Sequence, residues 1–122
     1  MIPYADLAAL MQASVALLNP SLFEGRSTPV EEARALGVPL LLSDLAVHRE
    51  QAGDDAVYFE RHSAAALADA LQGFQPVPEA YRAQLTFKAR AAVAGRVRRF
   101  AADFADVVVA CAAAQSHVKV TA

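Results

Sequence analysis

Two glutamates, Glu24 and Glu32, lie eight residues apart and are separated by a glycine-containing turn and the start of a helix. Glu24 follows a short apolar run that predicts a strand, and open parallel sheets place their ligand sites at strand ends. Thr28, Pro29 and Glu31 predict a capping box, in which Glu31 reaches back to the cap and leaves Glu32 free. Carboxylates at a strand end and a helix N-terminus indicate a ligand that carries both hydroxyl groups and phosphate.

The loop between the glutamates consists of Gly25, Arg26, Ser27 and Thr28. Its backbone N–H groups precede a predicted helix N-terminus, which suits a diphosphate. The Arg26 guanidinium either adds a phosphate contact or is solvated, and the sequence leaves both interpretations open. No spacing of His, Cys and Asp suggests a metal site.

Short apolar runs that alternate with helical patterns predict an α/β fold with a partial Rossmann-like parallel sheet of about three strands. The predicted strands cover residues 14–18, 39–43 and 56–59. The predicted helices cover residues 4–13, 29–36, 64–74 and 79 to about 114, with a single helical turn at 48–51. Gly37 is expected to end a helix in the left-handed conformation, Asp44 to cap the single turn, and Gly95 to kink or divide the long helix.

The long predicted helix combines an apolar stripe with a basic cluster. The stripe follows steps of three and four along Val93, Val97, Phe100, Phe104, Val108 and Cys111. The basic cluster consists of Arg96, Arg98 and Arg99. This cluster is interpreted either as a solvated face or as a contact with another domain or an anionic acceptor.

The composition limits the possible classes. A chain of 122 residues forms one domain at most, and 56% hydrophobic content with 20% charged residues predicts a core and not disorder. The absence of an apolar run of about 18 residues, of a signal-peptide pattern and of a second cysteine favours a cytoplasmic protein.

Charge is unevenly spread along the chain. Residues 1–80 contain four arginines and eleven acidic residues, whereas residues 81–122 contain seven basic and two acidic residues. The basic tail could meet phosphate, an anionic membrane surface or the acidic body, and the net charge of −2 gives little support to nucleic-acid binding.

The Glu24-x7-Glu32 pair, followed by Ala33 to Pro39, resembles the signature of the retaining family-4 glycosyltransferases. The similarity continues through residues 43–53 and 57–59 and covers most of residues 1–110. This family has a GT-B fold, in which two Rossmann-like domains enclose the active site, and the chain resembles the last part of the second domain. It departs from the family where Arg26 and Ser27 replace an aromatic residue and a second glycine.

The resemblance implies transfer of a sugar from a nucleotide-sugar donor to a hydroxyl acceptor, with retention and without a cofactor or metal. It implies Glu24 as the catalytic residue that holds the donor sugar, Glu32 as the ribose ligand, and residues 25–28 as phosphate ligands. It also implies a partial nucleotide-sugar-binding domain at residues 1–78 and a helical segment at 79–122 that packs on it. A role in polysaccharide synthesis, peripheral at the inner membrane face, follows from the resemblance alone.

His48 has two interpretations: it is a base, or, like Glu50, it orders the pocket wall. The family's remaining diphosphate ligands and its acceptor site precede the segment that this chain resembles, so we expect weak donor binding and no catalysis by the chain alone. Met1 is expected to be an internal methionine of a longer protein or the first codon of a truncated reading frame.

The main alternative is a non-catalytic, stand-alone half-domain. Such a module would bind a partner, such as the missing N-terminal domain, or self-associate through an exposed sheet edge and the long helix. A small signalling domain of the response-regulator type would need an acidic cluster at the end of its first strand, which this sequence lacks.

Overall fold

A computed structural model describes the backbone of residues 2–118 and side chains up to residue 114, and it confirms the α/β fold. The elements are α1 (Tyr4–Ala13), β1 (Leu17–Asn19), α2 (Thr28–Leu36), β2 (Leu40–Ser43), α3 (Ala46–Ala52), β3 (Ala56–Phe59), α4 (Ala64–Gly73) and α5 (Glu79–Val118). The chain divides into two compact units, Met1–Arg90 and Ala91–Ala122, which are described separately below.

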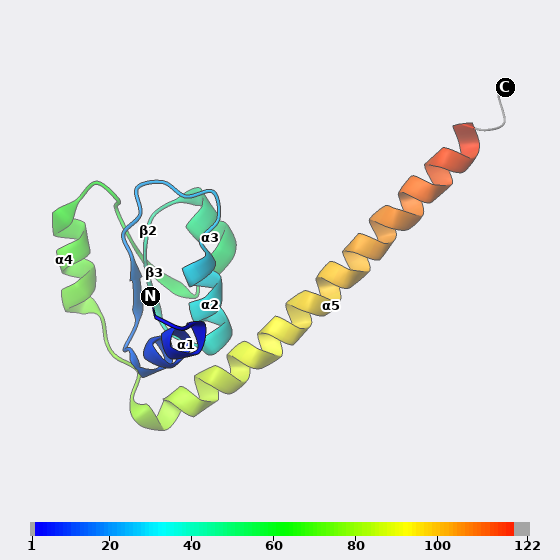
Figure 1. The fold of residues 1–122 in the computed structure, drawn as a ribbon. Coiled ribbons are helices and arrows are strands. Elements are labelled where there is room, and N and C mark those ends of the chain that lie inside the picture. Colours follow the sequence, from blue (N-terminus) through cyan, green and yellow to red (C-terminus); the bar gives the residue numbers. More distant parts are fainter. Residues whose placement is uncertain (1, 119–122) are drawn as a thin grey trace. The chain divides into compact units, whose positions relative to one another are not determined.

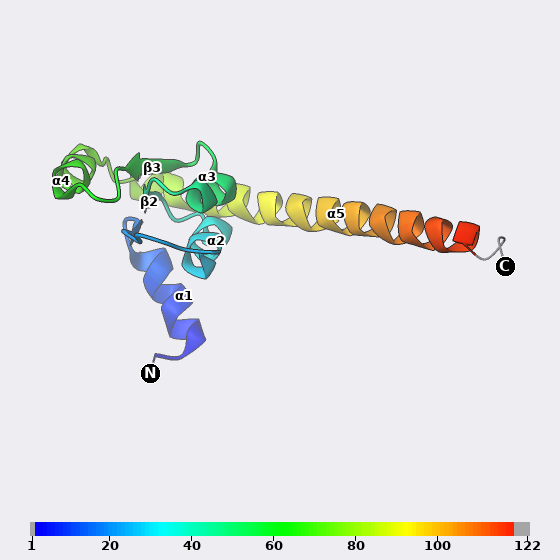
Figure 2. The same ribbon diagram turned by 90° about the horizontal axis from the view of Figure 1, so that it is seen from above.

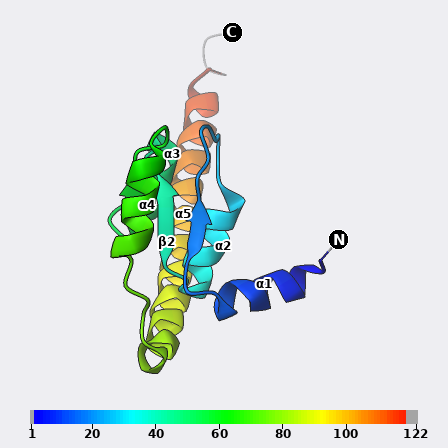
Figure 3. The ribbon, with the colours of Figure 1, turned by 90° about the vertical axis from the view of Figure 1, so that its left-hand side faces the viewer.

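Within residues 2–90, three parallel strands form a sheet in the order β1-β2-β3. Leu17 pairs with Leu40, and Leu40 pairs with Ala56. Figure 1 shows α4 on one side of the strands and α2 and α3 on the other. The arrows of β1 and β2 point the same way in Figure 3. All three strands therefore end at one edge of the sheet, and Glu24 follows β1 at this edge.

The central strand β2 is buried over its whole length, as expected for an interior parallel strand. A core cluster joins this strand to α2 and α3 through Val30, Ala33, Val38, Leu40, Leu42 and Ala52. Leu42 is 0% exposed. Burial of these apolar side chains fixes the two helices against the sheet and so positions the loops at its carboxyl edge.

The start of α2 differs from the prediction. Its N-cap is Ser27 and not Thr28, and in the described structure no side chain makes a capping hydrogen bond there. Gln51 satisfies this end instead, because its Oε1 accepts from the Ser27 N–H at 3.0 Å and its Nε2 donates to the Ser27 carbonyl at 3.0 Å. The Glu31 carboxylate accepts from Gln51 Nε2 at 3.2 Å. The predicted capping box is therefore wrong, since a residue from α3 replaces it.

Gly37 ends α2 in the left-handed conformation, as predicted, with φ 74° and ψ 25°. A Cβ atom at this position would lie 2.8 Å from the carbonyl carbon and oxygen of Leu85 and 2.9 Å from the Thr86 nitrogen. Glycine is thus required both by the backbone conformation and by the close approach of α5.

Two further boundaries differ from the predictions. The first strand begins at Leu17, because the Ser14 N–H still donates to the Leu10 and Met11 carbonyls and ends α1. Asp44 does not cap α3 but accepts two hydrogen bonds from Arg49, at 2.6 and 2.8 Å. The resulting helix α3 has seven residues instead of a single turn.

Residues 91–118 continue α5 as one helix, and the predicted interruption at Gly95 is wrong (Figure 2). The apolar side chains of this part are exposed, with Val97 62%, Phe100 70% and Phe104 60% accessible. The rings of Phe100 and Phe104 stack with their centroids 6.1 Å apart, a pairing that supports the helix locally. No helix among residues 2–118 has the length and apolar character needed to span a bilayer.

Candidate functional site

Side chains at the end of β1 and directly after it hold the Glu24 carboxylate in place. Its Oε1 accepts from Asn19 Nδ2 at 2.9 Å and from Ser21 Oγ at 2.5 Å. Asn19 Oδ1 in turn accepts from the Ser21 N–H at 3.2 Å, which closes a small turn after the strand. The Glu24 side chain remains 18% exposed. One carboxylate oxygen is therefore fully engaged by the fold, and the carboxylate as a whole still reaches solvent.

The second carboxylate oxygen faces His48, a residue of α3 that is 0% exposed. Glu24 Oε2 and His48 Nε2 are 3.7 Å apart. The other ring nitrogen, Nδ1, lies 2.8 Å from the carbonyl oxygen of Ser43, the last residue of β2. The ends of two neighbouring strands thus fix the relative positions of the carboxylate and the imidazole.

Glu24 is ionised in this environment. Burial raises the pKa of its carboxyl, but hydrogen bonds from Ser21, Asn19 and Ser27 and the electrostatic interaction with His48 together lower the pKa by more, so it lies below the ordinary value of 4.5. An ionised carboxylate can only accept hydrogen bonds, which suits hydroxyl groups as ligands.

In the loop at residues 25–28, some hydrogen-bonding groups already have partners within the fold and others are available to a ligand. Ser27 is 2% exposed, its N–H donates to Gln51, and its Oγ accepts from Asn19 Nδ2 at 2.9 Å. The N–H groups of Gly25, Arg26 and Thr28 therefore remain as candidates for a ligand at this helix N-terminus. The Arg26 side chain is 76% exposed and its Nη2 lies 3.8 Å from Glu31 Oε1, so this guanidinium can move toward a ligand at little cost.

Glu32 lies on α2 and accepts a hydrogen bond from the Tyr4 hydroxyl at 3.2 Å. This hydrogen bond raises the pKa of Tyr4. Among the described side chains, no hydrogen bond or ion pair joins Glu32 to Glu24. Glu24 and Ser27 are thus brought together through Asn19, whereas Glu32 has a separate partner on α1.

A comparison with known protein families decides the identity of this domain. The family described as glycosyl transferases group 1 matches residues 1–75. The chain belongs to the group 1 glycosyltransferase family. Comparisons with curated proteins and with solved structures gave no significant match.

The matched residues of this group 1 glycosyltransferase domain include the whole Glu24 environment. The sequence indicated Glu24 as a candidate but did not indicate Asn19 and Ser21, which hold its carboxylate, or Gln51, which holds Ser27. Asn19 had a usable signal, because it directly follows the predicted strand at residues 14–18 that leads to Glu24. Gln51 had none, since its role depends on how α3 packs against the start of α2.

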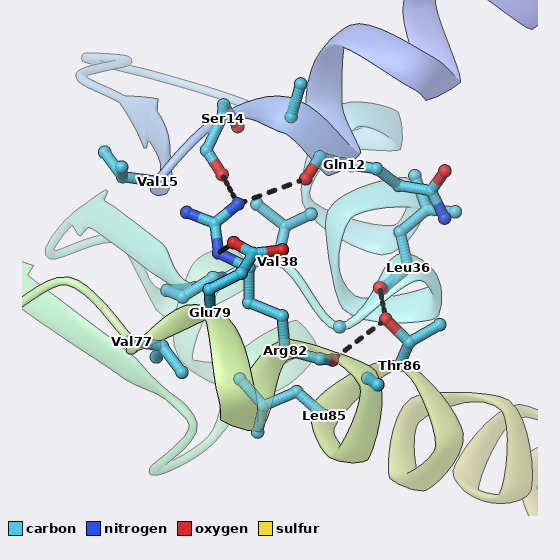
Figure 4. A pocket seen from close by; sticks show the side chains of 14 residues that line it. Gln12, Ser14, Val15, Leu36, Val38, Val77, Glu79, Arg82, Leu85 and Thr86 are labelled. Atoms are coloured by element: carbon cyan, nitrogen blue, oxygen red, sulfur yellow. Dashed lines mark hydrogen bonds and ion pairs between the residues drawn. The ribbon is translucent and has the colours of Figure 1, made fainter.

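A cavity of this domain lies away from Glu24. It has a volume of about 430 Å³, and Ser14, Val15 and Val38 are among the residues that line it (Figure 4). These residues precede β1 and β2, so the cavity lies at the edge of the sheet opposite Glu24. Its Arg82 is engaged by Glu79 at 3.1 Å and by the Ser14 carbonyl at 3.5 Å. We interpret this cavity as a gap in the packing around the start of α5, and not as the ligand-binding site.

Among residues 2–114, no group of three or more His, Cys, Asp and Glu side chains gathers in a way that could hold a metal ion. The polar groups at the carboxyl edge instead combine one ionised carboxylate, one imidazole nitrogen and several backbone N–H groups. This combination can accept hydrogen bonds from hydroxyls and donate hydrogen bonds to an anion.

Proposed function

We propose that this protein is the donor-binding part of a retaining glycosyltransferase, which transfers a sugar from a nucleotide sugar to a hydroxyl acceptor. The observation that supports it is the fixed Glu24 carboxylate at the carboxyl edge of a group 1 glycosyltransferase domain. A carboxylate held in place by Asn19 and Ser21 can orient sugar hydroxyls through charge-assisted hydrogen bonds. In this proposal Glu24 is the catalytic residue, because it contacts the sugar that reacts.

Glu32 binds the ribose of the nucleotide in the same proposal. Its carboxylate is partly exposed on the first turns of α2 and is engaged only by a hydroxyl, that of Tyr4, among the described residues. Ribose hydroxyls can replace this tyrosine hydroxyl as donors without leaving the carboxylate unpaired.

The diphosphate lies at the N-terminus of α2, where Gly25, Arg26 and Thr28 supply N–H groups and Arg26 supplies a mobile positive charge. A helix N-terminus contributes only about 0.3–1 kcal/mol per exposed charge. We therefore expect this chain to bind nucleotide sugars weakly and to need further cationic groups for tight binding and for transfer.

The proposal is tested by NMR titration of the chain with UDP-glucose and GDP-mannose, each compared with its free nucleoside diphosphate. Glu24→Gln should weaken binding of the nucleotide sugar by about tenfold and leave the nucleoside diphosphate unaffected. Glu32→Gln should weaken both ligands, since both contain the ribose. Glu60→Gln, an exposed glutamate after β3, serves as the matched control.

Three results would count against the proposal. Absence of binding by every nucleotide sugar and nucleoside diphosphate would remove the donor-binding role. Equal effects of the Glu24 and Glu60 substitutions would remove Glu24 from the site. An unchanged affinity in Glu32→Gln would remove the ribose assignment while leaving the sugar assignment in place.

A second candidate function is self-association through residues 93–111 of α5. The observation that favours it is the apolar stripe, in which Val97, Phe100 and Phe104 are each at least 60% exposed. The stripe carries arginines at 96, 98 and 99 on one side of its centre and Asp103 and Asp106 on the other. Two antiparallel copies would bury the stripe and set arginines against aspartates.

This second candidate predicts a concentration-dependent mass in sedimentation equilibrium. Phe100→Glu should abolish the association, because it places charge in the buried seam. Ala102→Glu, which lies off the stripe on the same helix, is the control and should associate like the unchanged chain. A monomer at all concentrations for the unchanged chain would exclude self-association as a function.

A further inference from the structure

His48 Nε2 is a buried side-chain nitrogen for which no hydrogen-bond partner is found within the described part of the chain. Its imidazole ring is 0% exposed, and the nitrogen is directed at Glu24. Buried polar atoms in folded proteins are nearly always hydrogen-bonded, and leaving one unpaired costs free energy. This nitrogen therefore requires a hydrogen-bonding group that the described part of the chain does not supply.

The rest of the ring is firmly anchored. Nδ1 lies 2.8 Å from the Ser43 carbonyl oxygen, and because a carbonyl only accepts, Nδ1 carries the proton. The Ser43 hydroxyl is 3.4 Å from Nδ1 but donates to the Ser21 carbonyl at 2.6 Å. Rotation of the ring would break the bond to Ser43, so Nε2 stays directed at the Glu24 carboxylate.

The His48 and Glu24 side chains place two hydrogen-bonding atoms next to each other. The 3.7 Å from Nε2 to Glu24 Oε2 is too long for a direct hydrogen bond. Glu24 Oε1 already accepts from Asn19 and Ser21, which leaves Oε2 as the oxygen available for a ligand. Nε2 and Oε2 therefore form two adjacent, incompletely used hydrogen-bonding positions beside a carboxylate side chain that is 18% exposed.

We infer that His48 Nε2 and Glu24 Oε2 jointly hold neighbouring hydroxyls of the donor sugar. With the proton on Nδ1, Nε2 accepts a hydrogen bond from one hydroxyl and Oε2 accepts from the other, so that both positions are satisfied. This inference rests on the proposed function. In this inference His48 contacts the sugar of the nucleotide-sugar donor directly. It is then neither a base nor a residue that only orders the pocket wall.

The test uses His48→Asn in the full chain. The Asn side chain keeps an N–H near the position of Nδ1, so the bond to the Ser43 carbonyl can be retained while Nε2 is removed. We expect the dissociation constant for UDP-glucose or GDP-mannose to rise about tenfold and that for UDP or GDP to stay unchanged. His62→Asn, which changes an exposed histidine after β3, is the matched control and should affect neither ligand.

A second measurement on the unchanged chain does not depend on the variant folding. The ¹⁵N resonance of His48 Nε2 should shift on addition of a nucleotide sugar and stay in place with the nucleoside diphosphate alone. Nucleotide-sugar binding with no shift at Nε2, or with unchanged affinity in His48→Asn, would overturn the inference and leave the proposed function standing. No binding of any of these ligands would overturn the proposed function, and the inference would fall with it.

Discussion

Residues 2–90 and residues 91–118 differ in where their large apolar side chains lie. In the first region, Leu41 and Leu42 of β2 are at most 1% exposed and pack between helices. In the second region, Phe100 and Phe104 are at least 60% exposed on a single helix. The first region thus gains its stability from tertiary burial, whereas the second depends on local helix-forming interactions.

The comparison extends to the polar groups. In residues 2–90, Asn19, Ser21, Gln51 and His48 form a linked set of hydrogen bonds around the carboxyl edge of the sheet. In residues 91–114, the charged side chains are mostly exposed on the helix surface. A site that must hold a ligand in one geometry requires the first arrangement, and a surface that must meet a macromolecular partner suits the second.

The largest expected effect separates the two regions by stability. Leu42→Ala should lower the free energy of unfolding by about 2–5 kcal/mol, because it leaves a cavity in the core. Phe100→Ala should change it by less than about 0.5 kcal/mol in the monomer, because the ring is exposed. Urea unfolding of both variants at low protein concentration measures the difference, and equal losses would contradict the comparison.

Glycine substitutions should act with opposite signs in the two regions. Gly37→Ala should destabilise the fold by about 1–3 kcal/mol, because it combines positive φ with a clash against the α5 backbone. Gly95→Ala should stabilise α5 by about 0.5–1 kcal/mol, because no described atom lies within 4 Å of the new Cβ. Thermal unfolding followed by circular dichroism tests both signs, and stabilisation by Gly37→Ala would refute the close approach seen here.

A smaller effect is expected from the pH dependence of the Glu24 site. Because its pKa in the folded state lies below 4.5, the ionised carboxylate stabilises the fold above that pH, and the contribution is lost as the pH falls through the lowered pKa. Glu24→Gln should remove about 1 kcal/mol of this acid sensitivity. Unfolding measured from pH 6 to pH 3 checks this.

The control for the pH experiment is Asp44→Asn. The Arg49 hydrogen bond lowers the pKa of Asp44, but this pair is exposed, so its contribution should disappear in high salt. The Glu24 contribution should persist in high salt because its main partners, the side chains of Ser21, Asn19 and Ser27, are neutral hydrogen-bond donors. If high salt removed the stability contributions of both Glu24 and Asp44, the Glu24 carboxylate would be no better shielded from solvent ions than a surface carboxylate.

The features that the sequence predicted correctly depend on residues close together in the chain, whereas the cap of α2 and the position of Glu24 beside His48 depend on contacts between distant residues. Gly37 and the three strands were predicted because left-handed glycine and buried apolar runs are local signals. The cap of α2 was predicted wrongly because Gln51, 24 residues from Ser27, takes over its backbone groups. Glu24 was named as a candidate from its place after a strand, but its position beside His48 depends on the packing of α3 against the sheet, which no local pattern specifies.

The central claim is that the carboxyl edge of the sheet, and not α5, binds the nucleotide sugar. Backbone ¹H–¹⁵N spectra of the chain during titration with UDP-glucose or GDP-mannose test it most directly. The account predicts that the largest shifts occur at Gly25, Arg26 and Thr28, with residues 91–114 unaffected. Shifts confined to residues 91–114, or to the cavity at Ser14 and Arg82, would contradict it.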